Sequence, residues 1–250
     1  MEPALAVEGL GFSYPARANV LEDISFGVSA GEAVAVIGPS GAGKSTLFRI
    51  IAHLAAPAAG RIVLGGEDIY GASSRRRLRG AIGYVHQQHG LPVGIAASMA
   101  VLGGEMHRWS VWRLLTSALI GPGETDLARV SEVLCRVGLG GRESDRVGEM
   151  SVGQRQRVAV ARTLLQAPRV IVADEPVASV DSATADVVLG LLAEEAARGA
   201  IVLCSVHDVG KARRHFPRII GLDRGRLTFD GPREDLPDEV AAGVRDRDVA

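Results

Sequence analysis

The chain has 250 residues and a formal net charge of −1, with 47% hydrophobic and 23% charged residues. This composition is that of a folded globular protein and excludes a disordered or fibrous one, and the near-zero charge does not favour nucleic acid as a partner. The two cysteines, Cys135 and Cys204, lack the spacing of a zinc site or a disulfide framework. No signal peptide is recognisable, and no apolar stretch approaches the ~20 residues of a membrane span, so we expect membrane contact only through partners.

The first part of the chain predicts strands followed by one helix. Residues 5–28 alternate apolar and polar side chains between turn residues, which predicts antiparallel strands. The continuously apolar run 33–38 predicts a strand covered on both faces, and the glycine-rich loop after it leads into a helix-like run over residues 46–55. Residues 61–69 predict a short strand pair, and residues 81–87 predict a core strand that ends in a polar loop.

The second part predicts alternating helices and strands. From about residue 90 to 150 the character is helical with glycine and proline breaks, which indicates a helical subdomain inserted in the sheet domain. A helix that begins near Ser151 and another over residues 182–198 alternate with apolar strands, and a final strand pair follows. We therefore expect an α/β fold over residues 1–231, with a mainly parallel core sheet and an antiparallel β subdomain. The polar tail, residues 232–250, has no periodicity to interpret.

One segment carries a specific phosphate-binding pattern. GPSGAGKS, residues 38–45, fits G-x-x-x-x-G-K-[ST] between a buried strand and a helix, the setting in which this pattern marks a nucleotide phosphate site. Backbone N–H groups and the helix N-terminus would surround the phosphates, Lys44 would reach the β- and γ-phosphates, and Ser45 would bind Mg²⁺. The predicted ATP-binding residues here are Gly38, Pro39, Ser40, Gly41, Ala42, Gly43, Lys44, Ser45 and Thr46.

A second motif supplies two carboxylates. VIVADE, residues 170–175, is an apolar strand that ends in Asp174 and Glu175, whose side chains point to opposite sides. Asp174 would hold Mg²⁺ with Ser45, and Glu175 would polarise the water that attacks the γ-phosphate. Taken alone, such a pair is more often a solvated strand end, but together with the phosphate loop it predicts a P-loop NTPase.

A third motif resembles a family signature. MSVGQ, residues 150–154, resembles the LSGGQ signature of ABC ATPases: Ser151, Gly153 and Gln154 match, whereas Met150 and Val152 depart from it. In that family, this helix start binds the γ-phosphate of an ATP held by the opposite subunit, and a hydroxyl with helix N-terminal N–H groups suits an anion. Taken alone, the segment reads as an ordinary N-capped helix.

Further positions match the family in order. By this resemblance Gln87 senses Mg²⁺ and the attacking water, with Gln88 as the competing assignment by one residue. Residues 179–181, ending in Asp181, resemble the loop that crosses the dimer interface, although Ser182 stands where proline is common.

A histidine and a tyrosine also match positions of the family. His207, at the end of an apolar strand, resembles the histidine that contacts the γ-phosphate, and Tyr14 resembles the aromatic that stacks on adenine. A solvated strand-end histidine and a core tyrosine are the simpler structural interpretations of these two residues.

The resemblance covers residues 5–231 and implies a homodimer that binds two ATP molecules with Mg²⁺ at the cytoplasmic face of a membrane. It also implies partner permease subunits and, through them, an extracytoplasmic solute-binding protein, with no nucleic acid. Residues 86–104, 107–115 and 173–181 look most like the ATP-binding subunits of phosphonate importers. The arginine run within residues 73–80 is interpreted as a solvated helix face.

Trp109 and Trp112, one helical turn apart, are expected to share a helix face, either packed inside the helical subdomain or lining a groove for a permease helix. Two alternatives to a transport ATPase remain from the sequence. One is an ABC-type ATP-driven switch or assembly protein that takes no part in transport. The other is a subunit that binds ATP but hardly hydrolyses it.

Overall fold

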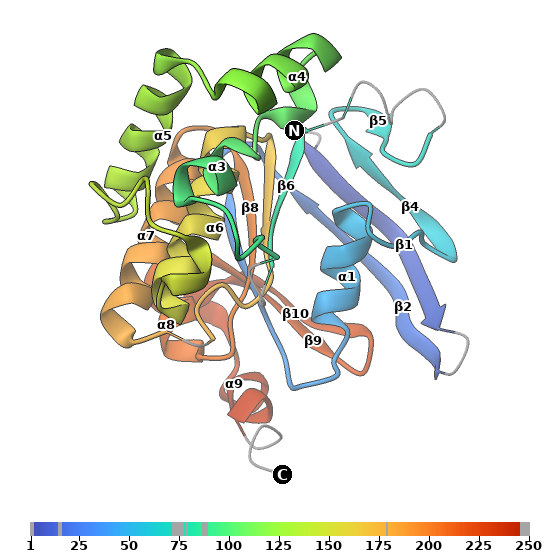
Figure 1. The fold of residues 1–250 in the computed structure, drawn as a ribbon. Coiled ribbons are helices and arrows are strands. Elements are labelled where there is room, and N and C mark those ends of the chain that lie inside the picture. The colour runs from blue at the N-terminus through green and yellow to red at the C-terminus, as the bar shows by residue number, and fades with distance from the viewer. Residues whose placement is uncertain are drawn as a thin grey trace.

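Two sheets form the framework of the protein. In the computed structural model, which describes residues 3–14, 17–71, 78, 80–86, 90–178 and 180–245, a four-stranded sheet packs beside a six-stranded one (Figure 1). The strands are β1 Leu5–Tyr14, β2 Arg17–Val28, β3 Ala33–Ile37, β4 Ala59–Leu64, β5 Glu67–Asp68, β6 Ile82–Val85, β7 Val170–Ala173, β8 Ile201–Ser205, β9 Arg218–Asp223 and β10 Arg226–Pro232. The helices are α1 Lys44–Ile51, α3 Ala97–Leu102, α4 Val111–Ile120, α5 Glu124–Arg136, α6 Val152–Gln166, α7 Ser182–Ala197, α8 Val209–His215 and α9 Asp238–Arg245.

The six-stranded sheet has the order β10-β9-β3-β8-β7-β6 and is parallel except for the β9–β10 pair. Every residue of β3, β7 and β8 is buried, as the unbroken apolar runs predict. Alternate side chains along these strands enter two different cores: Val34 and Val36 face one, whereas Ala35 and Ile37 face the other. The parallel sheet therefore has protein on both faces.

The first core lies between the two sheets. The four-stranded sheet has the order β2-β1-β4-β5 and is antiparallel, as predicted. Helix α1 lies between it and the six-stranded sheet (Figure 1) and contributes Leu47, Phe48, Ile50 and Ile51 to this core. The helix that follows the phosphate loop is thus fixed by apolar contacts on several sides.

The second core lies under the remaining helices. Helices α3, α4 and α5, with the short 3₁₀ turns η1 Met106–Arg108 and η2 Val147–Glu149, come between β6 and α6 in the chain. Of these, α3 and α5 pack with α6, α7 and α8 on the face of the six-stranded sheet that lies opposite α1 (Figure 1). The predicted α/β class, with its parallel core sheet, antiparallel subdomain and helical insertion, is confirmed. All helices of the described ranges are too short or too polar to cross a lipid bilayer.

The prediction that Trp109 and Trp112 share one helix face is wrong. Helix α4 begins only at Val111, because the Ser110 hydroxyl accepts a hydrogen bond from the Arg113 backbone N–H at 3.2 Å and caps the helix. Trp109 precedes the helix, packs against the second core and lies 4.5 Å beneath the Arg113 guanidinium, whereas Trp112 is 78% exposed.

The segment after β10 is folded. It forms the 3₁₀ turn η3 Arg233–Asp235 and then α9, and its residues Leu236 and Val244 are buried in the second core. The Arg213 guanidinium donates a hydrogen bond to the Leu236 carbonyl at 3.0 Å. These contacts join the segment to the six-stranded sheet and to α8.

Candidate active site

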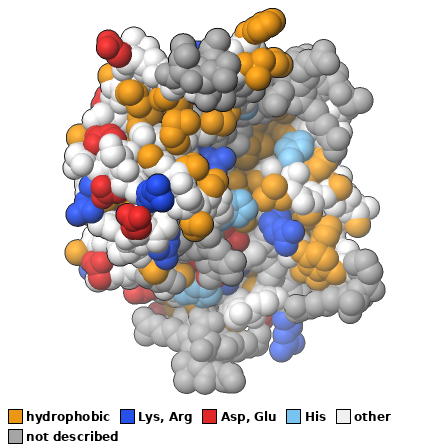
Figure 2. Space-filling model, in the orientation of Figure 1, with side chains coloured by type: hydrophobic (Ala, Val, Ile, Leu, Met, Phe, Trp, Pro, Cys, Tyr) orange, Lys and Arg blue, Asp and Glu red, His pale blue; other side chains and the backbone are white. Residues whose placement is uncertain are grey.

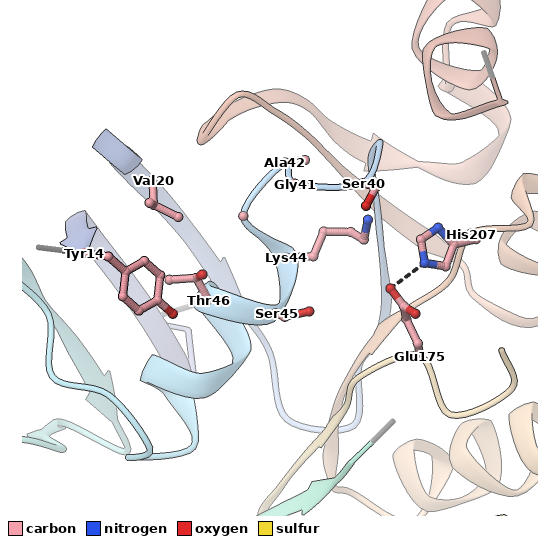
Figure 3. A pocket seen from close by; sticks show the side chains of 11 residues that line it. Tyr14, Val20, Ser40, Gly41, Ala42, Lys44, Ser45, Thr46, Glu175 and His207 are labelled. Atoms are coloured by element: carbon pink, nitrogen blue, oxygen red, sulfur yellow. Dashed lines mark ion pairs between the residues drawn. The ribbon is translucent and has the colours of Figure 1, made fainter. Parts of the chain in front are cut away.

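A cavity of about 360 Å³ lies where α1, the end of β1 and the ends of β7 and β8 meet. Figure 3 shows Tyr14 on one side of it, Lys44 and Ser45 in the middle, and Glu175 with His207 opposite. Its lining residues are Tyr14, Val20, Ser40, Gly41, Ala42, Gly43, Lys44, Ser45, Thr46, Glu175 and His207. Most of the predicted phosphate loop therefore shares one cavity with Glu175, the predicted base, and with His207, the predicted γ-phosphate contact.

The phosphate loop turns sharply between β3 and α1, and two of its glycines are required by the backbone. Gly38 has φ +155°, and a Cβ there would lie 2.1 Å from the Leu222 carbonyl oxygen. Gly43 has φ +108° and caps α1, and a Cβ there would lie 3.0 Å from the Val20 carbonyl oxygen. A side chain at either position would force the loop apart.

Lys44 is held inside this loop. Its side chain is almost fully buried, and its Nζ donates hydrogen bonds to the carbonyl oxygens of Gly38, at 2.7 Å, and Pro39, at 3.2 Å. Gly38 and Pro39 themselves line a second cavity, of about 200 Å³, behind the loop. The loop thus places one cation beside the N-terminus of α1, where the backbone N–H groups also favour an anion.

Asp174 is buried and accepts hydrogen bonds from three hydroxyl groups. Ser45 Oγ lies 3.2 Å from Oδ1, Ser205 Oγ lies 2.9 Å from Oδ1, and Tyr84 Oη lies 3.0 Å from Oδ2. Burial first, and the negative charge of Asp174 second, raise the pKa of Tyr84 above its usual value, so the phenol stays protonated and remains a donor at neutral pH. The carboxylate is therefore fixed by α1, β6 and β8 together.

Glu175 points toward His207 (Figure 3). Its backbone adopts a left-handed conformation with φ +49°, which few residues with a side chain adopt. One carboxylate oxygen pairs with His207 Nε2, as the dashed line in Figure 3 marks, and the side chain is largely buried. The two neighbouring carboxylates thus have separate partners, as the strand-end motif predicts.

Ser45 and Asp174 fit a Mg²⁺ ion that is shared with phosphate groups. Both offer hard oxygen atoms, and these atoms lie 3.2 Å apart beside the phosphate loop. Within the described ranges no group of three or more His, Cys, Asp or Glu residues is placed to hold a metal by itself. This set suits Mg²⁺, which usually takes one or two protein ligands and completes its shell with phosphate and water.

Tyr14 and Thr46 line the same cavity as the phosphate loop (Figure 3). Tyr14 is 36% exposed, and its ring packs edge-on against Phe12, with ring centroids 4.8 Å apart. Tyr14 is thus partly accessible from the cavity, and its stacking on adenine stays a prediction.

The residues of the signature segment do not line this cavity. Ser151 caps α6 in a reciprocal capping box: its Oγ accepts from the Gln154 backbone N–H at 3.2 Å, and the Gln154 side chain accepts from the Ser151 N–H at 2.8 Å. Val152 is 40% exposed, and Gly153 lies near Val180. The structure shows the capped helix, and the γ-phosphate contact in trans stays a prediction.

Asp181 also lies outside the cavity and caps α7. Its carboxylate accepts from the Thr184 backbone N–H at 2.9 Å and from the Thr184 hydroxyl at 2.7 Å. These hydrogen bonds, the backbone one first, lower the pKa of Asp181. Gln87, Gln88 and Ser179 lie outside the described residues, as does most of the arginine run.

Three residues of the site were not found from the sequence: Val20, which lines the cavity, and Tyr84 and Ser205, which hold Asp174. The only available signal for the last two was a polar side chain in an otherwise apolar strand, in IGYV and IVLCS. That signal becomes specific only when the strand register is known. Ala173 pairs with Val85 and with Cys204, which brings the neighbouring Tyr84 and Ser205 close to Asp174.

Comparison with known proteins identifies relatives of the chain. The family model described as ABC transporter matches residues 21–178. A phosphonates import ATP-binding protein of Pseudomonas aeruginosa is 43% identical over 232 residues, which cover 92% of this chain and 86% of the relative. A protein of the same description from Haloarcula marismortui is 38% identical over 246 residues, which cover 96% of this chain and 90% of the relative.

Solved structures agree with the sequence relatives. The dimeric post-hydrolysis structure of an ATP-binding cassette bound to ADP and Pi matches with a TM-score of 0.78 and 27% identity, covering 93% of this chain and 100% of that one. The cbiO1 protein of Clostridium perfringens, described as part of an ABC transporter complex, matches with a TM-score of 0.79 and 27% identity, covering 97% and 92%.

Proposed function

The chain belongs to the ABC transporter family as an ATP-binding, ATP-hydrolysing subunit, and from this premise we propose that it drives phosphonate import through partner permeases as one half of an ATP-dependent homodimer. The ATPase role rests on one observation: the phosphate loop, Glu175 and His207 line the same cavity. The relatives described as phosphonate importers support the choice of solute.

The described side chains divide the work of hydrolysis. Lys44 and the N–H groups of the loop bind the β- and γ-phosphates, and Ser45 with Asp174 holds Mg²⁺. Bound Mg²⁺ supplies positive charge that offsets the charge of the phosphate oxygens. Glu175 accepts a proton from the attacking water, while His207 orients the Glu175 carboxylate through their ion pair and faces the γ-phosphate.

A second copy of the chain completes the site. Ser151 and the first N–H groups of α6 suit an anion, but within one chain they lie away from the cavity. In the proposed dimer they bind the γ-phosphate held by the partner, and Asp181 lies at the interface. The dimeric relative bound to ADP and Pi supports this arrangement.

The helical part of the molecule is the proposed permease contact, at the cytoplasmic face of the membrane. Exposed hydrophobic side chains gather over it (Figure 2), with Val111, Trp112 and Leu115 of α4 exposed at 72%, 78% and 50%. Exposed apolar side chains that cluster in this way mark surfaces where proteins meet. Through the permeases, an extracytoplasmic binding protein would deliver the solute.

The test reconstitutes the chain with its permease and binding protein in liposomes and measures phosphate release. We expect methylphosphonate to raise the rate of ATP hydrolysis severalfold and sulfate to leave it unchanged. The Lys44→Ala variant serves as control and should lower the rate by about a hundredfold or more, because it removes a charge that stabilises the transferred phosphoryl group.

Hydrolysis no faster than that of Lys44→Ala, even with the permease present, would contradict the ATPase role. A response to sulfate or another solute without a response to methylphosphonate would contradict the solute assignment alone.

A further inference from the structure

One buried serine forms hydrogen bonds with both acidic residues at the end of β7. Ser205 ends β8 and is 0% exposed. Its hydroxyl donates to Asp174 Oδ1 at 2.9 Å and accepts from the Glu175 backbone N–H at 2.7 Å. A serine hydroxyl has one hydrogen to donate and lone pairs to accept with, so both bonds form at once.

The Glu175 backbone conformation depends on such a contact. A left-handed φ of +49° persists at a residue with a side chain only where its surroundings hold it. The turn directs the Glu175 carboxylate to His207 (Figure 3). The backbone N–H of Glu175 donates a hydrogen bond to the Ser205 hydroxyl. Ser205 therefore holds the turn that aims the proposed base.

Ser205 acts from behind the site. It does not line the cavity, whereas Ser45, which shares Asp174 Oδ1 with it, does. With Tyr84 on Oδ2, the Ser205 hydrogen bond leaves the Asp174 carboxylate little freedom to rotate away from Ser45. The parallel register, in which Ala173 pairs with Cys204, brings Ser205 beside Asp174.

We infer that Ser205 is a positioning residue for ATP hydrolysis, because its single hydroxyl fixes Asp174 and Glu175 relative to each other. The inference rests on the roles proposed for these two carboxylates. A small apolar residue would fill the same space in the sheet, but it would leave Asp174 with one donor fewer and the partly buried Glu175 N–H without its acceptor.

The first test replaces Ser205 with alanine. We expect Ser205→Ala to lower kcat by about tenfold to a hundredfold, since small displacements of catalytic groups have effects of that size, while KM for ATP changes less than about threefold. Cys204→Ala is the matched control, because it shortens a buried side chain of the same strand and leaves both hydrogen bonds intact. Its kcat should equal that of the wild type.

A second pair of variants separates the hydroxyl from packing. Thr and Val have nearly the same shape, and only Thr carries a hydroxyl. Any effect of the larger side chain is therefore the same in both variants. Ser205→Thr should keep most of kcat, whereas Ser205→Val should lose it. Binding of ATP gives a readout that does not depend on turnover. In EDTA, the dissociation constant of each Ser205 variant for ATP should equal that of the wild type. The tightening of ATP binding on adding Mg²⁺ should shrink in Ser205→Ala and Ser205→Val only.

Wild-type kcat in Ser205→Ala, or equal kcat in Ser205→Thr and Ser205→Val, would overturn the inference. A Glu175→Gln variant that hydrolyses ATP at the wild-type rate would instead overturn the role proposed for Glu175. The two failures are therefore distinguishable.

Discussion

Val152 is the first residue of helix α6, and its side chain projects beside the Ser151 cap. The capping box around it is intact, so Val152 does not disturb the helix start. In the proposed dimer, the same exposed side chain lies at the surface that meets the partner's γ-phosphate. A branched side chain there would keep the helix N-terminus from approaching the phosphate closely.

Val152→Gly should therefore raise the ATPase rate of the dimer by about twofold to fivefold, which corresponds to a barrier lower by about 0.4 to 1 kcal/mol. Glycine lowers the free energy of unfolding by no more than about 1 kcal/mol. Val152→Ala is the matched variant, since it removes most of the bulk and keeps a good helix former. Steady-state phosphate release is the measurement. Unchanged rates in both variants would show that the Val152 side chain does not limit the ATPase rate.

Residues of the site differ in how far the sequence could predict them. The phosphate loop was predictable because its chemistry lies in eight consecutive residues, 38–45. Ser205 and Tyr84 were not, because their role depends on the order and register of β6, β7 and β8, which are far apart in the chain. Local sequence patterns do not reveal which distant strands pair or in what register.

At the scale of elements, the continuous apolar runs correctly predicted β3, β7 and β8, because a strand buried on both faces needs no alternation. Helix α9 was not predicted. It has eight residues, Asp238–Arg245, too few for intrinsic helix propensity to be decisive, and it is held by packing against the rest of the chain. The expectation that Trp109 and Trp112 share a helix face failed for a similar reason, since a single serine cap sets the start of α4 after Trp109.

Helix α9 lies behind the phosphate loop. Its residues Val240 and Val244 line the 200 Å³ cavity that Gly38 and Pro39 also line, and Leu236 is buried just before it. The segment after β10 is therefore part of the support of the nucleotide site and belongs to the folded core.

Leu236→Ala should lower the free energy of unfolding by about 2 to 4 kcal/mol, because it removes a buried side chain and leaves a cavity. Asp235→Ala, at the exposed neighbouring position, is the control and should change it by less than about 0.5 kcal/mol. Urea denaturation followed by circular dichroism measures both. If Leu236→Ala behaved like Asp235→Ala, the segment would not be part of the folded core.

At the scale of the whole molecule, the residues of the proposed site lie on two separate faces of the chain. The cavity gathers the phosphate loop, Glu175 and His207, while Ser151 and Asp181 begin helices elsewhere on the same chain. A second copy is the simplest source of the missing γ-phosphate contacts. We therefore expect ATP to join two copies of this chain.

Sedimentation velocity of the Glu175→Gln variant tests that claim most directly, since a variant without its base should keep ATP and stay closed. With ATP and Mg²⁺ it should sediment as a dimer, twice the 26.2 kDa of one chain, and without ATP as a monomer. Adding Gly153→Asp should return it to a monomer: an acidic residue suits the first turn of α6, where a Cβ at 153 has room, but it repels the γ-phosphate. Gly153→Ala is the control and should still dimerise. A Glu175→Gln protein that stays monomeric with ATP and Mg²⁺, or a dimer that is insensitive to Gly153→Asp, would contradict the account.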